Sequence, residues 1–129
     1  EDPSRVINLG SVMGEIPMGD QAYSYSVSKA GVHHMTKILA KELGARQITV
    51  NALAPGPFQS GMTKFAIGED KGSARVAARV PAGRLGRPED IAGAIQFLCG
   101  AGGAYITGAI LPLSGGINVA TGPSIFGED

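Results

Sequence analysis

Short apolar runs alternate along this chain with longer stretches in which apolar residues recur at helical spacing. The three runs, residues 5–9, 48–53 and 109–113, consist mainly of aliphatic residues, and glycine, proline or serine follows each of them closely. This pattern is typical of buried strands that end in a turn. The sequence therefore predicts three strands.

Two helices are predicted between these strands. Over residues 25–43, apolar residues recur at steps of three and four, and Gly44 provides a natural stop. The second helix opens at Pro88, because proline and acidic residues are favoured in a first helical turn. Helix breakers are frequent over 58–87, where only a short helix at 73–79 is predicted. The expected apolar stripes are Val27, Gly31, Met35, Ile38, Leu39 and Leu43 on the first helix and Ile91, Ala94, Ile95 and Leu98 on the second.

The order strand, helix, strand, helix, strand favours the α/β class, with parallel strands joined by right-handed crossovers. In this arrangement Ser11, Pro55 and Ser114 lie just past the carboxyl ends of their strands. Open α/β sheets bind their ligands at that edge, so we expect the functional site there.

Composition narrows the range of functions. The 129 residues suit one domain, and eleven basic residues balance eleven acidic ones. Balanced charge, 5% aromatic residues and the absence of tryptophan argue against nucleic acid or an anionic membrane as a partner. No apolar run approaches the roughly 20 residues of a membrane helix. Cys99 is the only cysteine, so we expect a reducing, cytoplasmic setting and a small buried side chain at a helix end.

Three side chains carry the candidate chemistry: Ser11, Tyr25 and Lys29. Residues four apart lie on one face of a helix, so Lys29 is expected to stand beside Tyr25. At an effective dielectric constant near 20, an ammonium about 5 Å away favours the phenolate by about 3 kcal/mol. Desolvation opposes that effect. The pair is therefore a candidate proton donor and acceptor.

Each of these residues also has a simpler interpretation. Taken alone, Tyr25 and Lys29 fit a surface pair on a helix, and Ser11 fits a turn or cap residue. Tyr23 competes for the role of the phenol, but it has valine, not lysine, one turn later at Val27. Tyr23 is therefore expected to be a loop residue, and Tyr25 is the candidate phenol.

The adjacent pair His33 and His34 does not predict a metal site. Neighbouring residues point about 100° apart on a helix, so they cannot chelate one ion as an i, i+4 pair can. We expect these histidines to be solvated or to pack against the helix, and we expect no metal.

Several blocks of sequence together resemble the short-chain dehydrogenase/reductase family. Within it they are most similar to the 3-oxoacyl-acyl-carrier-protein reductases, in particular the kind assigned to rhamnolipid synthesis. One Tyr-x-x-x-Lys motif alone is weak, whereas five blocks in family order are specific. The blocks are residues 7–11, the pair Tyr25 and Lys29, and residues 51–56, 84–90 and 105–108.

The resemblance implies a role for each matching residue. Tyr25 would exchange a proton with the substrate oxygen, Lys29 would favour its phenolate and bind the nicotinamide ribose, and Ser11 would hold the substrate oxygen. The residues flanking the nicotinamide would be Pro55, Gly56, Phe58 and Ser60. Phe58 and Ser60 stand where the family often has isoleucine or valine and threonine.

The implied activity is reduction of a ketone with NADP or NAD as the cofactor. The substrate would be a small molecule or, more specifically, the 3-oxo group of an acyl thioester. Met13, Met18 and Met62 lie in segments that could line its cleft. The cluster around Arg84 and Asp90 is expected to be a solvated network at a helix start, with a contact to the carrier protein as the alternative.

The resemblance implies that residues 1–129 form the C-terminal half of one doubly wound, Rossmann-like domain, with residues 118–129 as a loose tail. The family's glycine-rich turn after a first strand is not found here, so we expect a fragment whose missing N-terminal half is a partner. A homo-oligomer, dimer or tetramer, is expected as well. The alternative function is a non-catalytic remnant or interaction module that needs the missing half to bind a cofactor.

Overall fold

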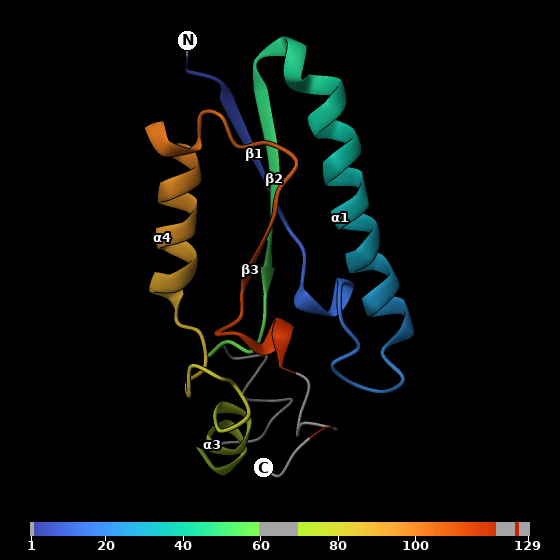
Figure 1. The fold of residues 1–129 in the computed structure, drawn as a ribbon, viewed down its shortest axis with the longest axis vertical. Helices are drawn as coiled ribbons and strands as arrows, with labels where there is room; N and C mark the ends of the chain where they lie inside the picture. The colour runs from blue at the N-terminus through green and yellow to red at the C-terminus, as the bar shows by residue number, and fades with distance from the viewer. Residues whose placement is uncertain (1, 60–69, 121–125, 127–129) are drawn as a thin grey trace.

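The computed structural model of this chain describes residues 2–59, 70–120 and 126. Its strands form one parallel sheet in the order β1-β2-β3, which confirms the predicted α/β class (Figure 1). Short 3-10 turns connect several of the elements. The strands and helices are β1 (Ser4–Leu9), α1 (Tyr23–Leu43), β2 (Ile48–Pro55), α3 (Asp70–Ala77), α4 (Pro88–Cys99) and β3 (Ile110–Leu113).

The central strand β2 supplies most of the core. Its residues 49–54 are all buried, because β1 and β3 pair with its two edges and helices cover both of its faces. A strand buried on both faces reads as a continuous apolar run and not as an alternating one. The run predicted at 48–53 has this character, and the strand extends two residues further, to Pro55.

The two crossovers of the sheet have opposite hand. Helix α1 lies against one face of the sheet and α4 against the other (Figure 1). The strands are parallel and follow one another in the order β1-β2-β3, so two helices on opposite faces cannot both complete right-handed crossovers. The prediction of right-handed crossovers is therefore wrong for one of them. The connection from β2, which ends at Pro55, to α4, which begins at Pro88, is long. It can therefore place α4 on the opposite face of the sheet, which a short turn from strand to helix could not do.

Helix α1 differs from its prediction at both ends. It begins at Tyr23, two residues early, and it does not stop at Gly44. Gly44 has φ −58° and begins a 3-10 turn, Gly44–Arg46, while the left-handed residue that ends the turn is Gln47, with φ 59°. The backbone N–H of Gln47 donates to the carbonyl of Gly44 at 3.0 Å. Gln47 thus adopts the left-handed backbone conformation that glycine usually adopts at a helix end.

Two of the three buried residues of α1 are polar, contrary to the predicted apolar stripe, of which Leu39 and Leu43 are only half-buried. His33, Thr36 and Ala40 are its buried residues. Thr36 donates to its own helix at the Val32 carbonyl and accepts from Asn8 Nδ2 of β1 at 3.0 Å. Hydrogen bonding makes burial of this face tolerable, since an unpaired buried polar group is costly. The exposed side chains from the predicted stripe include Val27, 71% exposed, Met35, 45%, and Ile38, 44%.

Helix α4 is held to β1 at its C-terminal end. Arg5 Nε donates to the Leu98 carbonyl at 2.8 Å and Nη2 donates to the Gly100 carbonyl at 2.7 Å. A guanidinium there satisfies carbonyls that the helix leaves unpaired and complements its dipole. Leu98 is the buried residue of α4, whereas Cys99 is exposed, which corrects the expectation of a buried cysteine. Adjacent helical residues point about 100° apart, so only one of them faces the sheet.

The start of the predicted tail is ordered by local hydrogen bonds. Ile117–Val119 forms a 3-10 turn, and Asn118 accepts a hydrogen bond from Ser114 at 2.8 Å. Residues 121–125 and 127–129 lie outside the described part, so the prediction of a loose tail stays open for them. No helix of the described residues has both the length and the apolar character needed to cross a membrane.

Candidate active site

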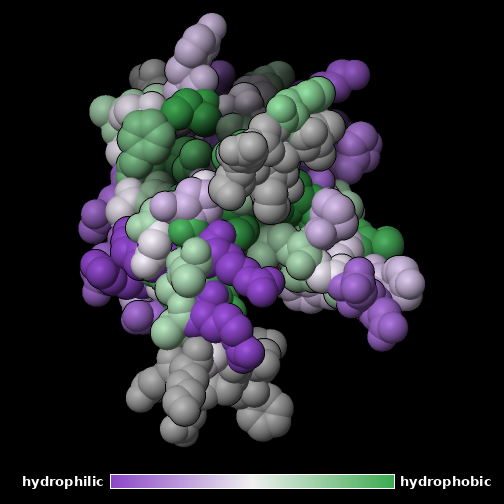
Figure 2. Space-filling view, turned by 60° about the horizontal axis from the view of Figure 1, so that its bottom comes forward, coloured by the Kyte–Doolittle hydropathy of each residue, from purple (hydrophilic) through white to green (hydrophobic). Residues whose placement is uncertain are grey.

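The candidate site lies at the carboxyl ends of the strands, where the sequence predicts it. Backbone hydrogen bonds continue past the strands: Gly10 donates to the Leu53 carbonyl at 2.7 Å, and Gly56 donates to the Leu113 carbonyl at 2.9 Å. The segment after β1 is therefore held to β2, and the segment after β2 is held to β3. Figure 2 turns this end of the molecule toward the viewer and shows hydrophobic and hydrophilic groups adjoining on it.

Lys29 stands between Tyr25 and the end of β1. Its Nζ atom lies 5.6 Å from the centre of the Tyr25 ring and donates a hydrogen bond to the Leu9 carbonyl at 3.2 Å. The carbonyl fixes the ammonium beside the phenol, and an ammonium near an aromatic ring is itself attractive. Tyr25 is 47% exposed, so its phenol is open to a ligand. The expected i, i+4 pairing on α1 is thus present in the structure.

Ser11 follows β1 and is buried, with 5% of its surface exposed. Its Oγ accepts a hydrogen bond from the Met13 backbone N–H at 3.1 Å and caps the 3-10 turn Val12–Gly14. The cap role, which was the simpler interpretation of Ser11, is therefore realised in this structure. Among the described residues, no hydrogen bond joins Ser11 to Tyr25. A hydroxyl that accepts one bond can still donate its proton or accept a second bond, so a substrate oxygen could engage it.

Sequence reasoning missed the part of His33 in this site. His33 is buried, with 3% exposed, and its Nε2 atom lies 3.2 Å from the backbone N of Ser11. Its Nδ1 atom lies 2.8 Å from Glu15 Oε1. The expectation of a solvated or helix-packing histidine captures the packing of His33 but not these two polar contacts. His34, its neighbour, is exposed.

The predicted nicotinamide-flanking segment is only partly described. Pro55 ends β2 in register with Leu113, and Gly56 follows it against Ser114, where an added Cβ would lie 3.0 Å from the Ser114 Cβ. Phe58 pairs with Gly86 across an isolated bridge. Ser60 and the cleft candidate Met62 lie outside the described residues.

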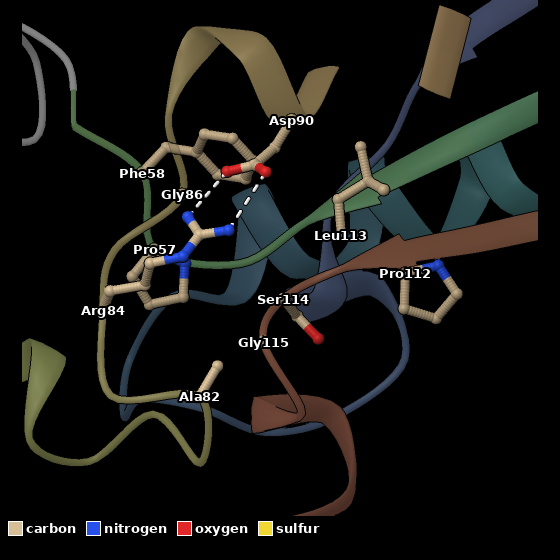
Figure 3. A pocket seen from close by; sticks show the side chains of 10 residues that line it. All are labelled: Pro57, Phe58, Ala82, Arg84, Gly86, Asp90, Pro112, Leu113, Ser114 and Gly115. Carbon is tan, nitrogen blue, oxygen red and sulfur yellow. Dashed lines mark hydrogen bonds and ion pairs between the residues drawn. The ribbon is translucent and has the colours of Figure 1, made fainter. Parts of the chain in front are cut away.

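A cavity of about 250 Å³ opens beside this segment (Figure 3). Across it the guanidinium of Arg84 faces the carboxylate of Asp90, with hydrogen bonds of 2.8 and 3.1 Å. Phe58 lies against Gly86, where a Cβ would come within 2.5 Å of the ring. Neither Tyr25 nor Lys29 lines this cavity. The lining residues are Pro57, Phe58, Ala82, Arg84, Gly86, Asp90, Pro112, Leu113, Ser114 and Gly115.

The ion pair in this cavity shifts both partners toward their charged forms. The hydrogen bond from Arg84, followed by that from the Arg87 backbone N–H, lowers the pKa of Asp90 to about 2. The same hydrogen bond and the charge of Asp90 raise the pKa of Arg84. The predicted solvated network is therefore present, and Arg84 has a partner within the chain.

A larger and more apolar cavity, of about 620 Å³, lies at the same end of the molecule. Met18 lines it, as the sequence suggests for a substrate cleft, and Pro57 joins it from the segment after β2. Within the described ranges, no group of three or more histidine, cysteine or acidic side chains is placed to hold a metal ion. The other lining residues of the cavity are Ile16, Pro17, Val76, Arg79, Ile117, Asn118 and Ala120.

Comparison with known proteins agrees with this geometry. Residues 1–118 match the family described as Enoyl-(Acyl carrier protein) reductase. The chain is 45% identical over 119 residues to the rhamnolipids biosynthesis 3-oxoacyl-(acyl-carrier-protein) reductase of Pseudomonas aeruginosa, covering 92% of this chain and 46% of that protein. It is 46% identical over 113 residues to the 3-oxoacyl-(acyl-carrier-protein) reductase FabG of Vibrio cholerae, covering 88% of this chain and 45% of that protein.

A solved structure gives the same result. The Pseudomonas aeruginosa RhlG/NADP active-site complex superposes with a TM-score of 0.83 at 46% identity, covering 90% of this chain and 47% of that one. The chain thus spans less than half the length of each of these three relatives. The family match over residues 1–118 confirms the resemblance read from the sequence. The chain belongs to the short-chain dehydrogenase/reductase family.

Proposed function

We propose that the protein carrying this chain reduces a ketone, the 3-oxo group of an acyl thioester, with NADPH as the hydride donor. The observation that carries the proposal is the position of Lys29, whose ammonium is fixed by the Leu9 carbonyl beside the exposed phenol of Tyr25. The names of the matching relatives, 3-oxoacyl-carrier-protein reductases and an NADP complex, support the substrate class and the cofactor.

In this proposal Tyr25 and Ser11 act on the substrate oxygen, and Lys29 acts through Tyr25. Tyr25 gives its phenolic proton to the oxygen as negative charge develops there, and Lys29 stabilises the phenolate that remains. The Ser11 hydroxyl donates a hydrogen bond to the same oxygen, while its Oγ still accepts a hydrogen bond from the Met13 backbone N–H. Lys29 has three N–H donors and uses one on Leu9, so two remain for Tyr25 and for a ribose hydroxyl.

The residues present fit one end of a nicotinamide cofactor. Lys29 would hold the ribose, and the backbone of Pro55, Gly56 and Phe58, at the end of β2, would flank the ring. When bound, the cofactor supplies the hydride, and the protein supplies orientation and charge. The described residues contain no G-x-G-x-x-G turn between a strand and a helix, the element that would hold the pyrophosphate.

The test is a Tyr25→Phe substitution in the enzyme that carries this chain. We expect turnover of a 3-oxoacyl thioester to fall by about 10²–10⁴-fold, because a positioned general acid contributes that much. Tyr23→Phe is the matched control, since Tyr23 is 77% exposed and has Val27 one turn later. Near-normal turnover by the Tyr25 variant, or an equal loss in both variants, would contradict the proposal.

The family description names a different reaction, reduction of an enoyl group. An enoyl substrate is reduced at a carbon–carbon double bond, so the two reactions are separated by parallel assays with 3-oxoacyl and enoyl thioesters of one chain length. We expect NADPH oxidation with the 3-oxoacyl thioester. NADPH oxidation with the enoyl thioester and not with the 3-oxoacyl thioester would show that the enzyme is an enoyl reductase and would contradict the proposal.

For the 129 residues by themselves we infer a weaker activity. Without a pyrophosphate turn they should bind NADPH poorly, and they fit the second candidate, a module that depends on the missing half. A fluorescence titration of the isolated chain measures this directly. Saturable, tight binding of NADPH would show that these residues suffice.

With Cys99 as the only cysteine, the proposed compartment is the reducing cytoplasm.

The exposed apolar residues of α1 support self-association. Val27, Met35 and Ile38 lie on the exposed side of a helix in which two of the three buried residues are polar. Apolar groups that gather on one face mark interaction sites. We infer that this face packs against a second copy of the chain. Sedimentation of Met35→Lys and Ile38→Lys variants should show a lower mass than the wild-type chain, with Lys37→Ala as the control.

A further inference from the structure

The His33 side chain is buried, and its contacts identify one tautomer. Its Nε2 atom lies 3.2 Å from the backbone N of Ser11. A backbone amide can only donate, so Nε2 must carry the lone pair. The tautomer with its proton on Nδ1 is the one that accommodates this contact.

The second ring nitrogen fixes that tautomer. Nδ1 lies 2.8 Å from Glu15 Oε1, so its proton is donated to the carboxylate. Glu15 follows the 3-10 turn Val12–Gly14, and Ser11 precedes it. One imidazole thus bridges both ends of this turn, with the carboxylate orienting the ring from the far side. A partner on one nitrogen that sets the state of the other is a known device in sites that depend on histidine.

Two glycines at the ends of the turn leave the space that the His33 ring occupies. A Cβ on Gly10 would overlap the His33 Nε2 and Cδ2 atoms. A Cβ on Gly14 would lie 2.9 Å from His33 Cε1 and 2.8 Å from the Lys29 carbonyl carbon. The imidazole therefore fills a slot between the two ends of the turn, and both ends lack the side chain that would displace it.

We propose that His33 is a positioning residue for Ser11, with Glu15 as the group that orients it. This inference rests on the proposed function, because it assigns His33 a part in placing the Ser11 hydroxyl. His33 reaches Ser11 through the backbone amide, and the Oγ position follows from that backbone. A misplacement of about 1 Å at a catalytic centre can cost about 10²-fold in rate.

Two substitutions separate positioning from plain packing. In His33→Gln the amide oxygen can reach the place of Nε2 and accept the Ser11 N–H, while the contact with Glu15 is lost. In His33→Asn the amide nitrogen can take the place of Nδ1 and donate to Glu15, while the Ser11 N–H loses its acceptor. Both variants shorten or replace the ring with a polar side chain, so both lose packing.

The first measurement uses the enzyme that carries this chain, with NADPH and a 3-oxoacyl thioester. We expect kcat of His33→Asn to fall by about 10²-fold, kcat of His33→Gln to stay within about tenfold, and the KM for NADPH to change little in both. Thermal unfolding of each variant is followed in parallel. An equal loss of kcat in both variants, or a loss that only follows the melting temperature, would overturn the positioning role.

The second measurement uses the 129-residue chain and needs no turnover. Imidazole ¹⁵N shifts should report a proton on Nδ1 and none on Nε2 of His33, and the Ser11 amide should exchange slowly with solvent. His33→Gln should keep that protection, and His33→Asn should lose at least about tenfold of it, as a broken hydrogen bond requires. A proton on Nε2, or fast exchange in the unsubstituted chain, would overturn the proposal.

The result for Tyr25 separates the two proposals. If Tyr25→Phe keeps normal turnover while the Ser11 amide behaves as expected, the proposed function fails and the His33 contact stands. If Tyr25→Phe abolishes turnover while the asparagine and glutamine variants of His33 are alike, the positioning role fails and the proposed function stands.

Discussion

The side-chain oxygen of Asn51 accepts a hydrogen bond from the backbone N of Ala109 at 2.9 Å, in the place of a strand partner. The amide nitrogen of the same side chain donates to the Ile106 carbonyl at 2.9 Å. Asn51 is buried in β2, with 2% exposed. The buried amide of Asn51 therefore helps to hold the chain that leads into β3, together with the backbone hydrogen bond from Gly108 to the Val50 carbonyl at 2.7 Å.

Replacement of this amide should be costly. Asn51→Leu leaves two backbone groups without these partners, and at about 1–3 kcal/mol for each we expect a loss of about 2–6 kcal/mol in the free energy of unfolding. Urea denaturation followed by circular dichroism measures it. Asn8→Leu is the matched control, because Asn8 is half-buried and donates one hydrogen bond, to Thr36. A loss of unfolding free energy no larger than that of the control would show that the Asn51 hydrogen bonds do not stabilise the segment leading into β3.

A side chain on Gly10 should disrupt the turn after β1. Gly10→Ala would place a methyl group on the His33 imidazole, so we expect a loss of about 1–3 kcal/mol, the usual cost of overpacking. Gly93→Ala, at an exposed position of α4 with open space around it, should instead stabilise the helix by about 0.5–1 kcal/mol. Melting temperatures of the two variants should therefore move in opposite directions. Equal shifts would contradict the slot described for His33.

The end of α1 offers two stabilising changes. Gly44 has helical angles and nothing within 4 Å of an added Cβ, so Gly44→Ala should raise the free energy of unfolding by about 0.4–1 kcal/mol. Gln47 has φ 59°, and Gln47→Gly should relieve about 1 kcal/mol of left-handed strain. Gln47→Ala, which keeps the strain, is the control. A destabilised Gly44→Ala variant would mean that this glycine is needed for the turn.

Acid should weaken the fold through Asp90. Its folded pKa of about 2 lies below the ordinary value of 3.8, so the carboxylate contributes stability above about pH 4 that is lost as the pH falls toward 2. We expect the free energy of unfolding to fall less steeply over this range in Asp90→Asn than in the unsubstituted chain. Arg84→Gln should flatten the slope as well, because Arg84 is the main cause of the shift. Unchanged slopes in both variants would exclude this ion pair as an acid-sensitive contact.

Local periodicity explains what could be predicted. The Tyr25 and Lys29 pair needs only the geometry of one helix, and the three strands need only their apolar runs. The contact of Lys29 with the Leu9 carbonyl needs the strand and helix to be packed first. The partners of His33 lie 22 and 18 residues away, so no local pattern signals them.

The apolar face of α1 shows a different reason for failure. Val27, Met35 and Ile38 have the spacing of a core stripe, but the structure leaves them exposed and buries His33 and Thr36. Spacing identifies an apolar face without identifying what covers it. Polar residues can occupy the sheet side when each finds a hydrogen-bond partner, and those partners come from other elements.

The hydrogen bonds from Arg5 to the C-terminal end of α4 also constrain when that helix can dock during synthesis. Their acceptors on Leu98 and Gly100 lie 93 and 95 residues further along the chain. At about 5–20 residues per second, a ribosome needs roughly 5–20 s to reach them after Arg5 has been made. Until then the Arg5 guanidinium has only its neighbours in the sequence, the Pro3 carbonyl and the Asp2 carboxylate, as partners among those the structure describes. Helix α4 can therefore dock on β1 only after the chain has been made as far as Gly100, and β3 is added to the sheet later still.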